Sequence, residues 1–233
     1  MGLDAANLGL LTAVYFLVLA GAQIPIGVLL DRFGPRRVQS VLLVVAAGGA
    51  ALFAASTGLL ELLIARAMIG IGVAAALMAG LKAIVTWFPR ERVALINGYM
   101  IMLGALGAVT ATAPAEWLMG YSGWRGLFEL SAAATLAAAL LIFLAVPDKA
   151  QLVLPQRTSL KLGAIYRDPR FWRIAPLSAS CIGSAWSLQG LWAAPWLADV
   201  EGFNREALIA QLFLMAIAVC LGALLLGTIA DRL

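Results

Sequence analysis

The sequence has no histidine, few charges and almost no cysteine. Of its 233 residues, 12% are charged and 63% are hydrophobic, whereas a soluble domain carries about 25% charged residues. Without histidine, imidazole chemistry is excluded. The 2 cysteines, Cys181 and Cys220, lie inside apolar runs and have no metal-binding spacing. No nucleotide-binding loop of the Walker type is present either, so ATP is not expected to drive the protein. We expect no metal, no cofactor and no enzymatic activity.

Long apolar runs fill most of the chain instead. The mean hydropathy is +0.97, and the runs reach the length of about 20 residues that crosses a hydrocarbon core. A membrane barrel would need short alternating strands, so helices are expected. The sequence therefore predicts an all-α multi-pass protein of the lipid bilayer. Its seven expected spans are residues 8–30, 38–56, 59–88, 93–115, 126–146, 172–197 and 207–230.

The basic residues predict how these spans are oriented. They occupy short loops rather than one face of a domain, which argues against a nucleic-acid partner. Arg125 and Arg205 fall on one side of the membrane, and Arg66 and Lys82 fall within a span. The other side carries Arg32, Arg36, Arg37, Arg90, Arg92, Lys149, Arg157, Lys161, Arg167, Arg170, Arg173 and Arg232. By the positive-inside rule that side is cytoplasmic, so the N-terminus is expected outside and the C-terminus inside, in a bacterial plasma membrane.

One long polar break divides the chain into two groups of spans. It runs from Pro147 to Phe171 and holds three prolines and many of the cytoplasmic charges. We expect residues 1–146 to form a partial helical bundle of five spans and residues 147–171 to be a cytoplasmic linker. Residues 172–233 would then begin a second bundle with two spans.

An internal repeat relates the two groups. When the chain is shifted by 200 positions, Gly27, Asp31 and Arg32 fall on Gly227, Asp231 and Arg232. The first span then falls on the seventh, and an offset of six spans preserves orientation. Parallel repeats about an axis along the membrane normal relate the two halves of one large class of transporters.

These residues resemble the major facilitator superfamily. The family has a loop Gly-x-x-x-Asp-Arg-x-Gly-x-Arg-Arg between its second and third helices, with a weaker copy between the eighth and ninth. The first copy is matched by Gly27, Asp31, Arg32, Gly34, Arg36 and Arg37, and the start of the second by Gly227, Asp231 and Arg232. Arg66, Gly70 and Gly72 match a further pattern of the fourth helix. The chain therefore looks like helices 2 to 8 of a truncated twelve-helix member.

The resemblance implies secondary transport of a small solute by alternating access. In the family the Asp-Arg loop is thought to clamp the cytoplasmic side in one of two states, so Asp31 is expected to have a conformational role. Its family partner, a helix of the missing second half, would lie outside this chain. Two alternatives stay open: a truncated membrane protein that does not transport unless another chain supplies the remainder, and a seven-helix receptor or sensor.

Polar residues inside the spans are candidates for the solute path. Arg66 lies roughly 10 Å deep in its span, where an ionisable residue usually faces a water-filled cavity. It could bind an anionic group, pair with a neighbouring helix or extend to the surface. Trp186, Gln189 and Trp192 lie at helical spacing in the sixth span, and Gln23 and Tyr15 are weaker candidates on the first.

Two other charged residues have more ordinary explanations. Glu129, near the outer end of the fifth span, is a candidate for proton coupling or simply a residue at the membrane boundary. Lys82 lies six residues before Phe88 and is expected to reach the cytoplasmic surface with its long side chain. The sequence does not identify the substrate or the coupling ion.

Overall fold

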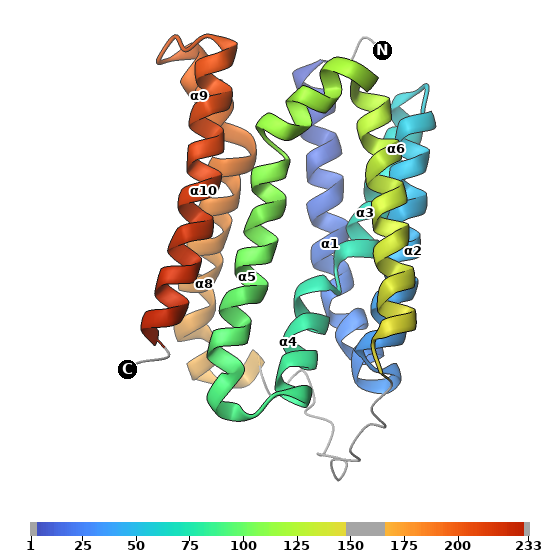
Figure 1. Cartoon of the computed structure of the whole chain (residues 1–233), viewed down its shortest axis with the longest axis vertical. Coiled ribbons are helices and arrows are strands. Elements are labelled where there is room, and N and C mark those ends of the chain that lie inside the picture. The colour runs from blue at the N-terminus through green and yellow to red at the C-terminus, as the bar shows by residue number, and fades with distance from the viewer. Residues whose placement is uncertain (1–3, 148–165, 231–233) are drawn as a thin grey trace.

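The structure is a computed structural model that describes residues 4–147 and 166–230. Within these ranges it consists of helices and their connections, without strands, which confirms the all-α prediction (Figure 1). The elements are α1 (Ala5–Phe33), α2 (Pro35–Ala55), α3 (Leu59–Val73), α4 (Ala76–Trp87), η1 (Arg90–Arg92), α5 (Val93–Thr110), α6 (Ala113–Ala145), α8 (Pro169–Ser187), η2 (Leu188–Trp192), α9 (Ala193–Asp199) and α10 (Arg205–Ala230).

Six helical stretches of the described chain are long and apolar enough to cross a membrane, with α3 and α4 together counting as one. They correspond to every predicted span except the sixth. That span is helical, but it is divided into α8, the π-helical segment η2 and α9. The span predicted over 172–197 is therefore helical, and a π-helical segment interrupts its α-helix in the second half.

Two further boundaries differ from the prediction. The fourth predicted span ends at residue 115, but α5 ends at Thr110 and α6 already begins at Ala113. Pro114 lies in the first turn of α6, where a missing backbone N–H costs nothing. Gly123, at φ 66° and ψ −179°, then bends α6 in a conformation that is essentially restricted to glycine. The turns before the bend cross the end of the bundle, and the turns after it run through the bundle (Figure 1).

The loop predicted to clamp the two states is a tight turn between α1 and α2. Gly34 adopts φ 80°, a left-handed value that favours glycine, and its N–H donates a hydrogen bond to the Leu30 carbonyl at 3.1 Å. Pro35 follows as the first residue of α2, where its fixed φ suits a helix start. The glycine of the motif is thus required by the turn itself.

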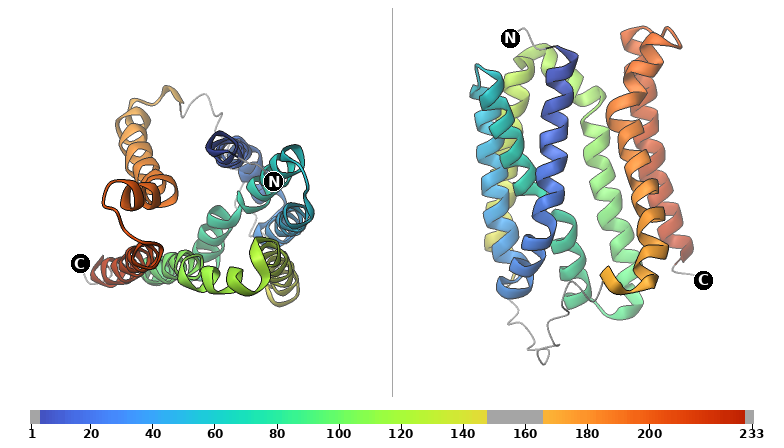
Figure 2. Two further views of the ribbon diagram at one scale, coloured as in Figure 1. Left: turned by 90° about the horizontal axis from the view of Figure 1, so that it is seen from above. Right: turned by 180° about the vertical axis from the view of Figure 1, so that it is seen from behind.

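The helices form two groups that meet along α5 (Figure 2). In the first group α2 packs against α3 and α6, and α1 packs against α3. In the second, α10 packs against α5 and continues from α9. The turn between α1 and α2 and the segment η1 lie at one end, and the described N-terminal residues lie at the opposite end (Figures 1 and 2). The first end is called here the basic end, because α2 begins with Arg36 and Arg37 in its first turn and η1 contains Arg90 and Arg92.

Glycines allow the closest helix contacts of the first group. A Cβ on Gly72 would lie 2.5 Å from the Ala46 nitrogen of α2, and one on Gly70 would lie 2.8 Å from the Tyr15 carbonyl oxygen of α1. Such small residues are what membrane helices use to approach each other. Large apolar side chains such as Leu17 and Leu144 are 74% and 77% exposed. An outer surface of this kind suits lipid, not water.

Candidate functional site

A cavity of about 420 Å³ lies inside the first helix group, toward the end opposite the basic end. Helices α1, α2, α3 and α6 all contribute to its wall. The lining consists of Leu8, Leu11, Thr12, Phe53, Leu62, Arg66, Trp124, Arg125 and Phe128. Most of these side chains are apolar or aromatic, two are arginines and none is acidic. Ligand cavities commonly have this form, an apolar wall with a few polar groups that fix orientation.

Arg66 supplies the deeper charge of this cavity. The carbon of its guanidinium group lies 4.9 Å from the ring centre of Phe53 and 5.9 Å from that of Phe128, within the range of cation–π attraction. Its Nε atom is buried and has no hydrogen-bond partner among the described residues. No carboxylate in residues 4–147 and 166–230 forms a salt bridge with it. Aromatic rings thus stabilise the cation but leave its donors available.

Arg125 supplies a second charge. It lies two residues after the bend at Gly123. Because of this bend, the first residues of the second part of α6, Trp124 and Arg125, line the cavity. Its Nη2 atom donates a hydrogen bond to the Ser56 carbonyl at 3.1 Å, and its guanidinium carbon lies 4.3 Å from the Trp124 ring centre. From the sequence, Arg125 could be assigned only to a side of the membrane, and its place in the cavity was not predicted. Arg125 and Ser56 are 69 residues apart, so no local sequence pattern predicts their contact.

The aromatic rings of the cavity form one continuous cluster. Phe53 lies 4.1 Å from Phe128 and 6.0 Å from Trp124, measured between ring centres. Both arginines therefore rest on the same wall, Arg66 on Phe53 and Arg125 on Trp124. These rings come from α2 and α6, which are distant in sequence, and neither Phe53 nor Phe128 was predicted as a site residue.

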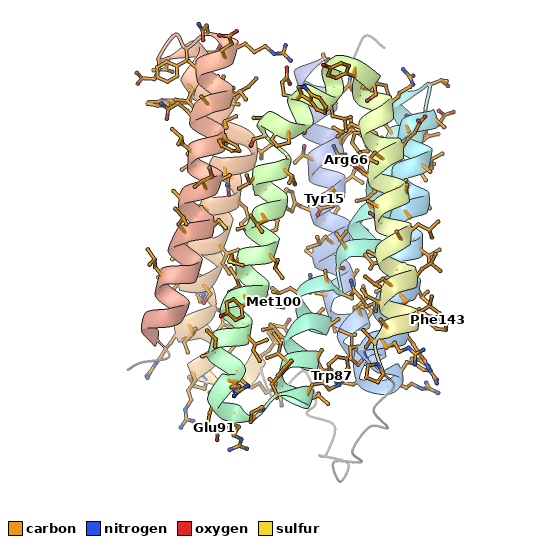
Figure 3. All side chains as sticks on the ribbon, in the orientation of Figure 1. Tyr15, Arg66, Trp87, Glu91, Met100 and Phe143 are labelled. Carbon is orange, nitrogen blue, oxygen red and sulfur yellow. The ribbon has the colours of Figure 1, made fainter. Side chains whose placement is uncertain are left out.

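Tyr15 lies close to Arg66 but outside the set that lines the cavity. Figure 3 shows the two side chains at neighbouring levels of α1 and α3, and they are near enough to interact electrostatically. The short contact between Gly70 and the backbone of Tyr15 brings these two helices together one turn beyond Arg66. Gln23 is partly buried two turns further along α1 and does not line this cavity.

The other predicted path residues are placed elsewhere. Trp186 on α8 packs edge-on against Phe16 of α1, with ring centres 6.0 Å apart, so it faces the first group across the gap between the two groups. Gln189 and Trp192 lie in the π-helical segment and are exposed. Segments of this type are frequent at functional sites. Glu129 is exposed on α6 and does not line the cavity, so its coupling role stays a prediction.

The motif loop makes its own contacts at the basic end. Asp31 forms a salt bridge with Lys82 of α4 at 2.7 Å, and the same ammonium group donates to the Leu30 carbonyl at 2.7 Å. The sequence did not predict this pair, and the expectation that a helix outside this chain partners Asp31 in the family stays a prediction. A sequence separation of 51 residues hid this pair. Lys82 does reach the basic end, as predicted.

Arg36 of the same loop holds the end of α6. Its Nε atom donates to the Phe143 carbonyl at 2.9 Å, and its guanidinium carbon lies 4.9 Å from the Phe143 ring centre. A positive group at a helix C-terminus satisfies carbonyls that have no partner in the helix and complements the helix dipole. Of the second copy of the motif, the structure describes only Gly227, which lies in α10. Asp231 and Arg232 lie outside the described residues.

A second cavity of about 490 Å³ lies between the two helix groups at the end opposite the basic end. Arg205 of α10 donates from Nε to a carboxylate oxygen of Glu116 on α6 at 2.9 Å across this boundary. Both residues line the cavity. In the described part of the chain, no group of three or more histidine, cysteine, aspartate or glutamate residues could hold a metal ion.

The apolar helices, the motif loop with its ion pair and the charged intramembrane cavity define an integral multi-pass membrane protein of the facilitator type. The family model "Major Facilitator Superfamily" matches residues 1–233, and the chain belongs to that family.

Similar curated proteins are transporters by name. All of this chain matches "Probable sulfoacetate transporter SauU" of Cupriavidus necator at 26% identity, over 58% of that protein. The hexuronate transporter of Escherichia coli K12 is 28% identical over 77% of this chain and 45% of its own length. The galacturonate transporter of Dickeya chrysanthemi is 28% identical over 76% of this chain and 58% of its own length. The chain thus spans about half the length of the curated relatives it matches.

Proposed function

We propose that this chain is part of a secondary transporter that moves a small organic anion across the membrane by alternating access. The observation that carries the proposal is Arg66, a guanidinium group in an apolar cavity without a carboxylate partner in the described residues. An intramembrane arginine is costly, and such residues usually mark a substrate path. Guanidinium also matches carboxylate geometry better than any other side chain does.

The relatives support an anion as the substrate class. Sulfoacetate, hexuronate and galacturonate, the solutes in their names, are all anions at neutral pH, and "Nitrate/nitrite transporter NrtP" of Picosynechococcus matches 42% of this chain at 36% identity. These solutes differ in size and polarity but share a negative group. Arg66 would bind that group, and Tyr15 beside it would act as a hydroxyl donor.

Loading and release need the two helix groups to move relative to each other. We propose that residues 1–146 and 172–233 belong to the two halves, joined by a linker over 147–171. Asp31, Arg36 and Lys82 would hold the basic end in one state. Trp186, Gln189, Trp192 and Gln23 would face the path between the halves, and Glu129 would take part in coupling.

The proposal is tested by uptake into proteoliposomes that contain the purified chain, with labelled galacturonate and labelled sulfoacetate. We expect uptake of at least one of them, lowered at least about tenfold in Arg66→Gln, because a hydrogen bond to a charged group contributes about 1.5–3 kcal/mol. Arg66→Lys keeps the charge without the fork of donors and should retain part of the activity. Arg90→Gln, in a loop at the basic end, should transport like the unaltered chain.

Two results would contradict the proposal. Uptake that is equal in Arg66→Gln and the unaltered chain would remove Arg66 from the path. Absence of uptake for either anion would favour the non-transporting alternative, in which this chain only functions together with a partner that supplies the other helices.

A further inference from the structure

We infer that Arg125 and Arg66 together form a two-point site for small dianions, a substrate class with a negative group at each end. The inference rests on the proposed function and narrows it. Arg66 would hold one anionic group deep in the cavity, and Arg125 would hold the other at the exposed side of the same cavity. Arg125 would therefore set specificity without being the main anchor.

The first observation is the position of the two charges. Both arginines line one cavity, and each guanidinium group is stacked on a ring of one aromatic cluster, Arg66 on Phe53 and Arg125 on Trp124. The two supporting rings are neighbours, 6.0 Å apart between centres. Stacking on a rigid ring limits the rotamers of a long side chain. The two cations are thus held on one wall before a ligand arrives.

The second observation is the charge balance of the cavity. Its lining carries two positive groups and no acidic residue. No carboxylate in residues 4–147 and 166–230 forms a salt bridge with either arginine. Two like charges that share a partly buried site repel each other, and a ligand with two negative groups neutralises both. A ligand with one negative group would leave one cation unbalanced.

The third observation is the number of free donors. A guanidinium group has five N–H donors, and Arg125 uses one of its nitrogens for the Ser56 carbonyl. Arg66 has its Nε atom buried without a partner among the described residues. Thr12 also lines the cavity, but its hydroxyl hydrogen is donated to the Leu8 carbonyl at 3.0 Å, so the donors for an anion come from the two arginines. A cavity of about 420 Å³ has room for compact dianions such as sulfoacetate or malonate.

The experiment compares matched ligands that differ by one charge. Equilibrium binding of malonate against acetate, and of sulfoacetate against methanesulfonate, is measured calorimetrically on the purified chain in lipid nanodiscs at neutral pH. The whole lining lies within residues 8–128, so binding does not depend on helices outside this chain. The variants are Arg125→Gln, Arg125→Lys and Arg66→Gln, with Arg170→Gln at the basic end as the matched loss of a distant charge.

We expect the unaltered chain and Arg170→Gln to bind each dianion more tightly than its partner monoanion. Arg125→Gln should weaken dianion binding at least about tenfold and leave monoanion binding within about twofold, because only the second contact is lost. Arg125→Lys should restore most of the preference, since a positive charge remains. Arg66→Gln should weaken both members of each pair.

If Arg125→Gln weakened the binding of both ligands of a pair equally and also lowered the melting temperature, the inference would be overturned. Arg125 would then have only a structural role, through its hydrogen bond to the Ser56 carbonyl. An unaltered chain that binds acetate as well as malonate would overturn it as well. In both cases the loss of binding in Arg66→Gln would leave the proposed function standing. No binding of any of the four anions by the unaltered chain would contradict both proposals.

Discussion

The charged residues that are candidates for function are those within membrane spans, because the positive-inside rule does not explain their positions. Placing an arginine near the centre of a membrane helix costs about 2.5–3.5 kcal/mol on the insertion scale. Contacts with Phe53 and Phe128 offset part of that cost for Arg66, but they do not use its hydrogen-bond donors. By contrast, Lys82 and Arg36 reach carbonyl or carboxylate oxygens at the basic end. The structure thus separates cations whose donors are used within the fold, such as Lys82 and Arg36, from Arg66, whose donors are available to a ligand.

The pair between Asp31 and Lys82 permits a prediction about stability. The two side chains are 82% and 33% exposed, in the order named, and solvent-exposed ion pairs contribute roughly 0–1 kcal/mol. In a double-mutant cycle of Asp31→Asn and Lys82→Gln, we expect a coupling energy below about 1 kcal/mol, measured from thermal unfolding in detergent. Lys82→Arg, which keeps the charge, serves as the control. A coupling of several kcal/mol would show that the pair is a structural anchor and would weaken its assignment as a releasable clamp.

At the scale of the elements, the contact between α2 and α3 depends on missing side chains. Gly72 brings α3 so close to α2 that a Cβ would lie 2.5 Å from two atoms of Ala46 and 2.6 Å from the Leu42 carbonyl oxygen. Backbone atoms cannot turn away as a flexible side chain can. The two helices would have to move apart, and their contact supports both the cavity and the position of Arg66.

Replacing Gly72 with alanine tests this contact. We expect Gly72→Ala to lower the free energy of unfolding by about 1–3 kcal/mol, the usual effect of overpacking a core, measured by denaturant unfolding in micelles. Gly104→Ala is the matched control, because no atom lies within 4 Å of its added Cβ and alanine favours a helix by about 0.5–1 kcal/mol over glycine. An unchanged stability in Gly72→Ala would mean that α2 and α3 are more loosely packed than the structure has them.

For the whole molecule, the distribution of charge predicts an orientation in the membrane. The described N-terminal residues and the end of α10 lie at opposite ends of the bundle (Figure 1). We propose that the basic end faces the cytoplasm, following the positive-inside rule. The opposite end, where Arg205 meets Glu116 and the Arg66 cavity lies, would then face outward.

Thiol labelling from outside intact cells tests this orientation. In a chain with Cys181→Ala and Cys220→Ala, we expect a membrane-impermeant reagent to label Thr57→Cys, in the loop between α2 and α3. Arg92→Cys, at the basic end, should be labelled only after the cells are opened. Equal labelling of Arg92→Cys in opened cells is the control for its reactivity. The reverse pattern in intact cells would contradict the proposed orientation.

The sequence predicted the elements better than it predicted their ends. Six of the seven predicted spans coincide with helical stretches that can cross a membrane, because twenty apolar residues in a row have few alternatives to a helix in lipid. The bend at Gly123 and the division of the span after Ser187 were not predicted. A glycine or a π-helical turn changes the path of a helix without changing its hydropathy. The motif loop was found because its spacing is local.

The candidate site was predicted only in part for a similar reason. Arg66 could be singled out because a charge within an apolar run is visible in one dimension. Arg125, Phe53 and Phe128 could not, since their significance arises from contacts between α2, α3 and α6. The pairing of Asp31 with Lys82 was not predicted either, because it depends on α4 lying beside α1.

The sequence by itself determined that this protein is an all-α membrane protein of the facilitator family, because hydropathy, charge and motif spacing are properties of the linear chain. Tertiary structure decided which charges are satisfied and which are left for a ligand. That decision depends on helix packing: small residues let α1, α2 and α3 approach, and the approach places two arginines on one aromatic wall. Distances between side chains 50 or more residues apart follow from that packing, and no local pattern encodes them.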